Sequence, residues 1–277
     1  MIKTFIKQTL NSIGYLIYLL LNNKLTFLIG DAVIRYRVEE KRKIKLGKIV
    51  IYLSTPNFLL RYRYNTFFTK EPETLQWIDG FEDKSVFLDV GANVGLYSIY
   101  AAVKKHAYVY AFEPSFFNLE FLARNIYNNQ LVDNINVIPV ALNQSIGVNN
   151  FHLTSTQWGG ALSTFDQSYD DSGNEIKPDF IYKTAGFDLD ALVVQLKIKK
   201  IDYIKIDVDG LEHLILLGAI NTLKNIKEVL IEINDNFYDQ SEKSSKILTD
   251  LGFYLDQKIY TEELTKQVSN QIWKRIK

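Results

Sequence analysis

The segment YIKIDVDGLEH, residues 203–213, ends an apolar run with the acids Asp207, Asp209 and Glu212. A carboxylate removed from water is costly unless it is paired with a cation or hydrogen-bonded. Three acids at the mouth of a buried strand therefore indicate a functional site. A carboxylate within hydrogen-bond reach of a hydroxyl can orient it and accept its proton, which makes Asp207 the first candidate for a general base and Asp209 the second.

Three further residues belong to this candidate catalytic group. Lys205 shares a strand face with Asp207, where it either neutralises the acids or forms a buried structural ion pair. Glu212 falls in the first turn of a helix, where the helix dipole favours negative charge, so it is either a helix-start acid or a substrate contact. Glu232 ends the next apolar run, LIEIND, and can reach the same mouth. Asp207, Asp209, Glu212 and Glu232 offer oxygen ligands suited to Mg²⁺. The spacing of these acids does not decide whether a metal binds, so we expect no metal and keep a divalent cation as the alternative.

A second group of residues surrounds a glycine-rich turn in FLDVGANVGLYS. Asp89 ends a strand, and Gly91 and Gly95 lie in the turn before a helix. Gly91 allows the sharp turn and the close approach of a ligand, and the helix start supplies unpaired N–H groups. Glu113 ends the following strand, a position from which an acid can hold ribose hydroxyls.

The charge of this turn favours one cofactor. A dinucleotide would place its pyrophosphate against Asp89, which repels it, and the spacing G-x-G-x-x-G is absent. A ligand with an ammonium and a sulfonium suits an acidic turn, and S-adenosylmethionine is such a ligand. NAD(P) and a purely structural turn remain as alternatives.

The elements that must position these residues alternate from Ser85 onward. Strands are predicted in SVFLDV, AYVYAFEP, NINVIPVAL, DYIKIDV, EVLIEIN and FYLDQKIY, and helices in LYSIYAAVKK, SFFNLEFLARNIYNN, LEHLILLGAINTLKN and SEKSSKILTDLG. This alternation predicts an α/β fold with a doubly wound, mostly parallel sheet, covered by helices on both faces, that binds ligands at the carboxyl ends of its strands. The polar segment Leu153–Lys183 interrupts the pattern, and we expect a lid or pocket rim there rather than a floppy insertion.

The first 80 residues follow a different pattern. The uncharged stretch around IGYLIYLLL is interrupted by Asn11, Ser12 and Gly14 and is shorter than the ~20 apolar residues of a membrane-spanning helix. No small-residue cleavage site follows it, which argues against a signal peptide. We expect a helix packed on the domain or on a partner, with a membrane-surface helix as the alternative. Short strands are predicted in RYRVEEKRKIKLGKIVIYL, and LLRYRYNTF is interpreted as a solvated strand face or a pocket wall.

Bulk composition limits the protein class. The 277 residues are 47% apolar and 23% charged, which suits a globular protein with a large core. The formal net charge is zero, so charge gives no case for nucleic-acid binding. The chain has no cysteine, which excludes disulfides and thiolate metal sites and permits a reducing compartment.

Three stretches resemble the FkbM family of S-adenosylmethionine-dependent methyltransferases. These are FLDVGANVGLYSIYAA, AFEPSFFNLEFLARNI and IDYIKIDVDGLEHLILLGA, with a weaker likeness in KEPETLQWI. The family usually has Glu where this chain has Asp209, whose side chain is shorter by one methylene. The resemblance implies a Rossmann-like, seven-stranded sheet with a reversed last strand. It also implies methyl transfer to an oxygen, often a sugar hydroxyl of a glycan or natural product.

The resemblance also implies a role for each residue that matches the family's motifs. The methionine half of the cofactor would contact Asp89, Gly91, Asn93 and Gly95. Glu113 would hold the ribose, Pro114 and Asn118 would shape the adenosine end, and Ala141 would flank the adenine.

Together these observations predict an N-terminal extension of a helix and short strands, residues 1–80, and a methyltransferase domain, residues 81–277. We expect O-methylation of a carbohydrate, with an NAD-dependent sugar oxidoreductase or epimerase and a catalytically silent adaptor as alternatives. The expected partner is a carbohydrate acceptor and not nucleic acid, with peripheral membrane contact and homo-oligomerisation left open. The expected location is the cytoplasm, with the inner membrane surface as a more specific alternative.

Overall fold

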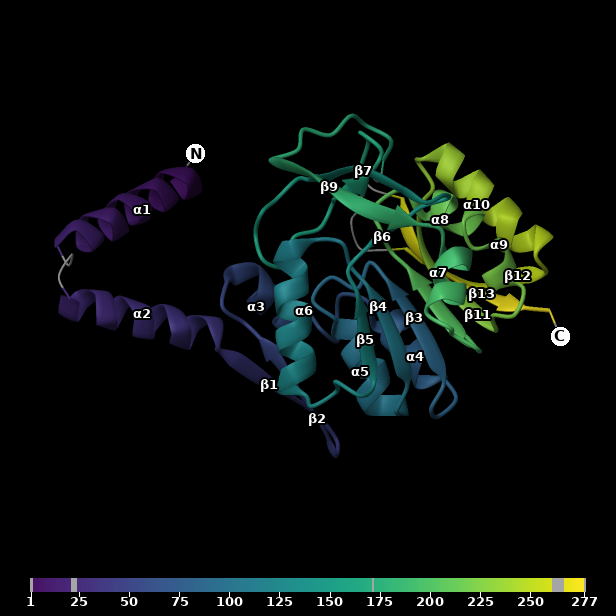
Figure 1. The fold of residues 1–277 in the computed structure, drawn as a ribbon, viewed down its shortest axis with the longest axis horizontal. Coiled ribbons are helices and arrows are strands. Elements are labelled where there is room, and N and C mark those ends of the chain that lie inside the picture. The colour runs from purple at the N-terminus through teal and green to yellow at the C-terminus, as the bar shows by residue number, and fades with distance from the viewer. Residues whose placement is uncertain (1, 21–23, 171, 261–266, 277) are drawn as a thin grey trace.

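The computed structural model describes residues 2–20, 24–170, 172–260 and 267–276, and its centre is a seven-stranded sheet (Figure 1). The strand order is β12-β13-β11-β10-β3-β4-β5. The strands are β3 (Val86–Val90), β4 (Tyr108–Phe112), β5 (Ile135–Ile138), β10 (Tyr203–Ile206), β11 (Glu228–Asn234), β12 (Phe253–Tyr260) and β13 (Val268–Arg275). Only β13 runs against its neighbours in this sheet, which confirms the mostly parallel sheet with a reversed last strand.

Both faces of the central strands β3 and β10 are buried because these strands are mostly apolar on both sides. Phe87 and Leu88 are neighbours on β3, are both fully buried, and belong to different hydrophobic clusters. One face packs against α4 (Pro72–Asp79), α5 (Leu96–Lys105) and α6 (Phe116–Asn128). The other packs against α7 (Leu189–Gln195), α8 (Glu212–Leu217), α9 (Ile220–Leu223) and α10 (Tyr238–Asp250). The single helix predicted in LEHLILLGAINTLKN is thus two helices, interrupted at Gly218 and Ala219.

A second, four-stranded sheet occupies the region expected to be a rim. Its order is β6-β9-β7-β8, from β6 (Ala141–Leu142), β7 (Gly147–Leu153), β8 (Thr164–Phe165) and β9 (Phe180–Phe187). The stretch NINVIPVAL, predicted as one strand, divides at Pro139 into β5 of the large sheet and β6 of the second sheet. Proline has no N–H to donate to a ladder, which is consistent with the strand ending there.

Residues 41–80 pack on the same core as the large sheet. The hairpin of β1 (Lys41–Leu46) and β2 (Ile49–Ser54) contributes Ile51 to the hydrophobic cluster that contains Phe87 and Trp77. The strand interpretation of LLRYRYNTF is wrong, because residues Phe58–Asn65 form helix α3. The Asn57 side chain accepts a hydrogen bond from Leu60 N at 2.8 Å and so caps this helix.

Helices α1 (Ile2–Leu20) and α2 (Lys24–Val38) extend away from the rest of the protein (Figure 1). The strand prediction is wrong for Arg35–Val38, which complete α2. Where their side chains are described, both helices expose apolar residues, such as Tyr18 at 64% and Phe27 at 75%. The expected packing of the first helix on the domain is therefore not observed for these side chains. Among the described residues, no helix is both long and apolar enough to cross a membrane.

Candidate active site

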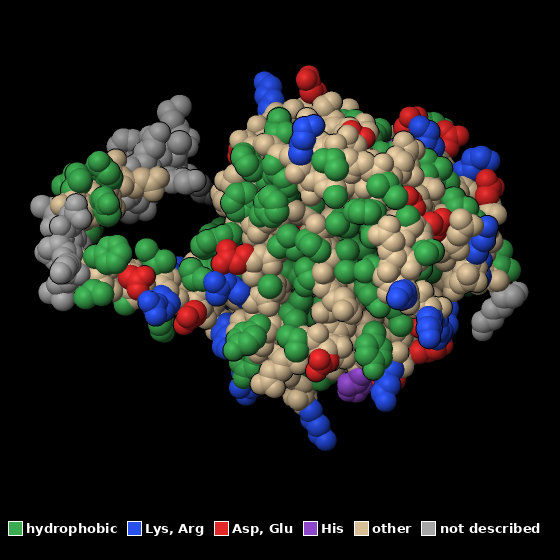
Figure 2. All heavy atoms as spheres, in the orientation of Figure 1, with side chains coloured by type: hydrophobic (Ala, Val, Ile, Leu, Met, Phe, Trp, Pro, Cys, Tyr) green, Lys and Arg blue, Asp and Glu red, His purple; other side chains and the backbone are tan. Residues whose placement is uncertain are grey.

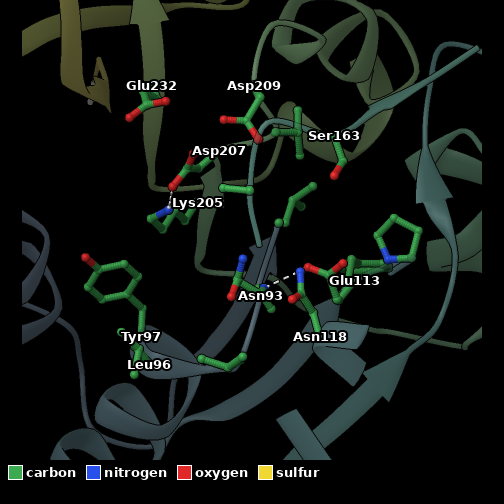
Figure 3. A pocket seen from close by; sticks show the side chains of 18 of the residues that line it. Asn93, Leu96, Tyr97, Glu113, Asn118, Ser163, Lys205, Asp207, Asp209 and Glu232 are labelled. Carbon is green, nitrogen blue, oxygen red and sulfur yellow. Dashed lines mark hydrogen bonds and ion pairs between the residues drawn. The ribbon is translucent and has the colours of Figure 1, made fainter. Parts of the chain in front are cut away.

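A pocket lies at the carboxyl ends of β3, β4, β10 and β11, and the second sheet forms part of its wall. Figure 3 shows the acids Asp207, Asp209 and Glu232 at one end of it and Glu113 with Asn118 at the other. Ten of the thirteen residues predicted from the sequence line this pocket. They are Gly91, Asn93, Glu113, Pro114, Asn118, Ala141, Lys205, Asp207, Asp209 and Glu232.

The acidic end of the pocket contains a close carboxylate group. One oxygen each of Asp207, Asp209 and Glu232 lies within 4.8 Å of the others, so these residues could hold a divalent cation. Lys205 already supplies a positive charge here, because its Nζ lies 2.5 Å from Asp207 Oδ2. The Lys205 side chain is only 1% exposed, and its Nζ lies 5.0 Å from the centre of the Tyr97 ring. Lys205 therefore serves as a buried ion-pair partner that also neutralises the acids.

The charges in this group shift each other's protonation. Burial disfavours the ammonium of Lys205, but the carboxylates of Asp207 and Glu71 outweigh burial and raise its pKa above the ordinary value. Burial alone would raise the pKa of Asp207, yet the positive charges of Lys205 and Lys70 hold it below the ordinary value. Burial and the negative charge of Asp207 raise the pKa of Glu232 well above its usual range. The group therefore contains one firmly ionised carboxylate, Asp207, beside one that retains its proton to higher pH.

Asp209 fixes the segment Trp158–Leu162, part of which lines the pocket and which we call the roof segment. The backbone of Asp209 is in the left-handed region at φ 59°, and its Oδ2 accepts a hydrogen bond from Leu162 N at 2.7 Å. Gly160 and Ala161 of the roof segment line the pocket, which confirms the expected rim for these residues. Asp209 thus joins the end of β10 to the roof segment.

Four more side chains anchor the roof segment through its backbone. Asn93 and Asn118 donate to Gly160 O at 2.7 and 3.1 Å, and Asn118 also accepts from Gly159 N. Arg63 donates from Nε and Nη2 to Gly159 O, at 3.0 and 2.6 Å. Asn57 donates to Trp158 O at 3.0 Å. The two asparagines predicted to contact the cofactor therefore also hold the roof over the pocket.

The glycine turn owes its shape to protein contacts as well as to the pocket. Gly91 has φ +81°, and a Cβ at this position would lie 1.8 Å from the backbone oxygen of Asp207. Asn93 follows at φ 51° in the left-handed region, which asparagine tolerates better than most residues. Gly95 also has a left-handed backbone, but it does not line the pocket. A Cβ at this position would meet Leu122 of α6 at 2.5 Å, so Gly95 faces that helix. The prediction that Gly95 lines the cofactor site is therefore not met.

Asp89 does not line the pocket either. It is 1% exposed, and its Oδ2 accepts a hydrogen bond from Ser98 Oγ at 2.5 Å. Asp89 is paired in register with Lys205 on the neighbouring strand and lies on the same face as Phe87, the face that packs against α5. Burial raises its pKa, and Lys205 opposes this effect. Asp89 therefore places its charge at the first turn of α5, and the acidity of the pocket comes from other carboxylates.

Glu113 lies at the opposite end of the pocket from the acid group. Its two oxygens accept hydrogen bonds from Asn93 N at 2.9 Å and Ser115 N at 2.7 Å. Burial raises its pKa to about 7, although these backbone donors oppose the shift. The lining beside it includes the apolar side chains of Pro114 and Ala141. A carboxylate next to apolar walls suits a ribose diol with an adenine beside it.

Glu212 supports the turn after β10 and does not line the pocket. It is 1% exposed and accepts hydrogen bonds from Val208 N at 3.0 Å and Gly210 N at 3.1 Å. Gln240 of α10 donates to it as well. Burial raises its pKa to about 7. Glu212 is thus the helix-start acid of the two alternatives, and no contact with the pocket is seen.

Sequence reasoning assigned no individual role to three other pocket residues, Lys70, Glu71 and Tyr97, whereas Arg63 lies in LLRYRYNTF, and the pocket-wall alternative is confirmed for this residue. Glu71 is 3% exposed and forms an ion pair with Lys70, with Nζ 2.8 Å from Oε1. Burial and the nearby Glu71 raise the pKa of the Tyr97 hydroxyl well above its ordinary value. The stretch KEPETLQWI contains the Lys70–Glu71 pair immediately before a helix that begins with proline, and its likeness to the family is the signal that could have found these two residues.

The donor set fits S-adenosylmethionine. The carboxylates at the acidic end suit an ammonium and a sulfonium, and Glu113 at the other end suits the ribose. Asn93 also carries a buried Oδ1 that has no hydrogen-bond partner among the described residues. Unsatisfied buried polar atoms are rare and call for a ligand or water.

Comparisons with known proteins agree with this interpretation of the site. A family model described as "Methyltransferase FkbM domain" matches residues 89–259, more than half of the chain. No curated protein matches the sequence significantly.

Several solved structures resemble the fold weakly. TYW2 of M. jannaschii, solved with AdoMet, has a TM-score of 0.44 and 13% identity, covering 85% of this chain and 87% of its own. A precorrin-6y C5,15-methyltransferase from Geobacter metallireducens has a TM-score of 0.43 and 14% identity, covering 75% and 87%. An rRNA methylase from Streptococcus thermophilus has a TM-score of 0.46 and 11% identity, covering 74% and 95%. These likenesses carry no information on what this chain methylates.

Proposed function

Because the chain belongs to the FkbM methyltransferase family, we propose that it methylates a hydroxyl of a carbohydrate, using S-adenosylmethionine as the methyl donor. The carbohydrate can be a nucleotide sugar or a glycan such as capsule or lipopolysaccharide. The observation that carries the proposal is the group of three carboxylates, Asp207, Asp209 and Glu232, within 4.8 Å of one another in the pocket. Sugar hydroxyls are hydrogen-bond donors, and carboxylates are strong acceptors for them.

In the proposed reaction, the residues at the acidic end of the pocket have different roles. When bound, S-adenosylmethionine supplies an electrophilic methyl group on a sulfonium. Asp207 accepts a hydrogen bond from the acceptor hydroxyl and takes its proton, a contribution of about 100- to 10,000-fold for general-base catalysis. Lys205 keeps Asp207 ionised and fixes its orientation through their 2.5 Å ion pair. Holding the acceptor oxygen in line for displacement supplies a further part of the acceleration.

Asp209 and Glu232 assist in different ways. Asp209 holds Leu162 of the roof segment, and so keeps the roof over the reacting atoms and limits water. Glu232 lies close enough to Asp207 for the protonation of one carboxylate to change the proton affinity of the other. Glu113, Asn93, Asn118, Pro114 and Ala141 would bind the nucleoside part of the cofactor, as the family resemblance implies.

The proposed function is tested with isotopically labelled S-adenosylmethionine. The full chain is incubated with nucleotide sugars and with glycan fractions, and the products are analysed by mass spectrometry for a methyl group on oxygen. Transfer of label to a protein, an RNA or a nitrogen atom would overturn the carbohydrate assignment. A parallel reaction with EDTA decides whether the three carboxylates act through a divalent cation.

Two alternatives are separated by binding and turnover. Family membership favours S-adenosylmethionine over NAD, and calorimetry with S-adenosylhomocysteine and with NAD measures that choice directly. A catalytically silent adaptor would bind S-adenosylhomocysteine yet transfer no label to any fraction. We also propose that the enzyme works in the cytoplasm. We propose no nucleic-acid partner, because the site is acidic and the net charge of the chain is zero.

Replacement of Glu113 should weaken cofactor binding. The variant Glu113→Gln removes the charged acceptor while keeping the side chain's size, and we expect S-adenosylhomocysteine to bind roughly 10- to 100-fold more weakly, as for lost hydrogen bonds to a charged group. In the wild type, affinity should rise as the pH increases through about 7, because Glu113 ionises with a pKa of about 7. The variant should lack this rise. Calorimetry across the pH range measures both, and an unchanged affinity would remove Glu113 from the cofactor site.

Activity should also depend on the protonation of Glu232. Its pKa is raised well above the ordinary value, and the negative charge of an ionised Glu232 raises the proton affinity of Asp207, the proposed base, whereas a protonated Glu232 does not. Activity should therefore fall as the pH drops through this raised pKa and recover as the pH rises. In the variant Glu232→Gln this pH step should disappear from kcat. A step of the same size at the same pH in the variant would assign the titration to another group.

A further inference from the structure

Helices α1 and α2, which we call the apolar arm, expose many large apolar side chains. On α1, Tyr15, Leu16, Ile17, Tyr18 and Leu19 are consecutive and are each about half exposed or more. Five consecutive residues cover every side of a helix, since each residue advances the turn by about 100°. A helical segment that is apolar on every side, such as residues 15–19, is normally buried in protein or in lipid.

The second helix of the apolar arm repeats this pattern. Phe27, Leu28 and Ile29 are consecutive and are 75%, 63% and 53% exposed, and Ile34 is 66% exposed. Figure 2 shows hydrophobic side chains along the arm, with charged side chains among them, standing clear of the globular part. Contiguous exposed apolar surface of this kind marks a site of interaction with a protein or a membrane.

The hairpin that follows the arm adds a positively charged surface. Lys41, Lys43 and Lys45 alternate along β1 and therefore point to one face, whereas Ile44 between them is buried in the core. Lys48 is exposed in the adjoining turn. We call Lys41, Lys43, Lys45 and Lys48 the lysine face.

Charge decides between the candidate partners of this surface. Residues 1–48 contain ten Lys or Arg and three Asp or Glu, a formal net charge of +7, although the whole chain is neutral. Two copies joined through their arms would bring two such charges together, which opposes a dimer. An anionic bilayer attracts the same charge and accepts the apolar side chains at once. The helices have 19 and 15 residues and do not meet the requirement for a spanning segment, so they would lie in the interface.

We infer that the apolar arm and the lysine face together bind the surface of a membrane that contains anionic lipids. The inference goes beyond the proposed function and does not rest on it, because none of its residues lines the pocket. Binding would hold the pocket close to membrane-linked acceptors.

The test uses flotation of the full chain with lipid vesicles. The vesicles contain phosphatidylcholine alone or phosphatidylcholine with phosphatidylglycerol, at low and high ionic strength. We expect strong binding only to the anionic vesicles, weakened by salt, because salt screens the attraction. Each lysine near an anionic surface contributes about five-fold, so Lys43→Gln/Lys45→Gln/Lys48→Gln should bind about 100-fold more weakly.

The matched control removes the same number of charges elsewhere. Lys199, Lys224 and Lys246 are exposed. They lie in or near helices α7, α9 and α10, which are on the far side of the protein from the arm (Figure 1). Their triple replacement by glutamine should leave vesicle binding unchanged. Equal loss of binding in this control would show that general charge, not the lysine face, is responsible, and would overturn the inference.

A second pair of variants tests the apolar part. Phe27→Gln/Ile34→Gln should bind vesicles at least about ten-fold more weakly, because burial of one large apolar side chain is worth that much or more. The control Val194→Gln/Tyr238→Gln changes residues of similar exposure, 76% and 72%, on α7 and α10. S-adenosylhomocysteine affinity should be unchanged in all four variants, which shows that each is folded.

Other occupants of the arm would give a different result. If neither vesicle composition binds the chain, or if both bind it equally, the inference is wrong. Sedimentation equilibrium without lipid identifies a second copy as the occupant if the chain is a dimer that Phe27→Gln/Ile34→Gln dissociates. A failure of the glycan assay leaves this result untouched, because flotation needs no methyl acceptor.

Discussion

The variant Asp207→Asn should keep its cofactor affinity and lose turnover by about 100- to 10,000-fold, the usual contribution of a general base. Asparagine preserves the shape of the side chain but removes the charge that accepts the hydroxyl proton. Asp209 and Glu232 remain at the acidic end and Glu113 lies at the other end of the pocket, so S-adenosylhomocysteine should still bind (Figure 3). Single-turnover kinetics with the acceptor found by mass analysis, and calorimetry with S-adenosylhomocysteine, measure the two effects separately.

Two features sharpen this test. Lys205 keeps the nearby carboxylates Glu71 and Asp89 when Asp207 is neutralised, so its charge is not left unpaired. The control Asp133→Asn makes the same chemical change at an exposed position outside the pocket and should leave turnover unchanged. If Asp207→Asn turns over at nearly the wild-type rate, alignment of the acceptor is sufficient and Asp207 is not the base.

The variant Gly91→Ala should lose most cofactor binding and much stability. Its Cβ would lie 1.8 Å from the backbone oxygen of Asp207, so the turn after β3 and the end of β10 must move apart. Both segments line the pocket, and both would shift away from the cofactor. Backbone strain at positive φ and a core clash together cost about 3 kcal/mol or more. For a chain of this size that corresponds to a fall in Tm of roughly 10 °C.

Gly47→Ala provides the matched control. Gly47 also has positive φ, +60°, but no atom lies within 4 Å of a Cβ there. The two variants share the cost of a left-handed alanine, and the difference between them isolates the contact with Asp207. Scanning calorimetry and titration with S-adenosylhomocysteine measure both variants. A Gly91→Ala protein with wild-type affinity would mean that the turn and β10 move independently.

The strands of the large sheet were predictable wherever both faces are apolar. The run that contains Phe87 and Leu88 illustrates this, because its residues are buried whichever way they point. Strand β13 did not stand out, since Ser269, Asn270 and Gln271 are polar although each is 2% exposed or less. Only the family resemblance implied a reversed last strand. The second sheet was also missed, because β7 and β9 mix polar and apolar residues within a region rich in polar side chains.

The site was predictable in its composition and less so in its geometry. Spacing placed Asp207 and Lys205 on one face, and the structure pairs them. The same two-residue period places Asp89 on the strand face of Phe87, which packs against α5. The sequence does not reveal which face of the strand meets the pocket, so it could not show that Asp89 lies outside it. The role of Glu212 depends on backbone amides of the turn before it and on Gln240 of α10. Contacts of this kind, between residues 28 positions apart, leave no pattern in the sequence.

The zero net charge of the chain conceals a strong separation of charge. The first 48 residues carry +7, so the remaining residues carry −7, and the molecule is a large electric dipole. A charged surface such as a membrane orients a dipole as well as attracting it. A negative surface attracts the positive end of the protein and repels the negative end. The same separation means that ion exchangers of either sign can retain the protein near its isoelectric point. Measurements that treat it as a uniformly neutral particle would therefore misjudge its behaviour at any charged boundary.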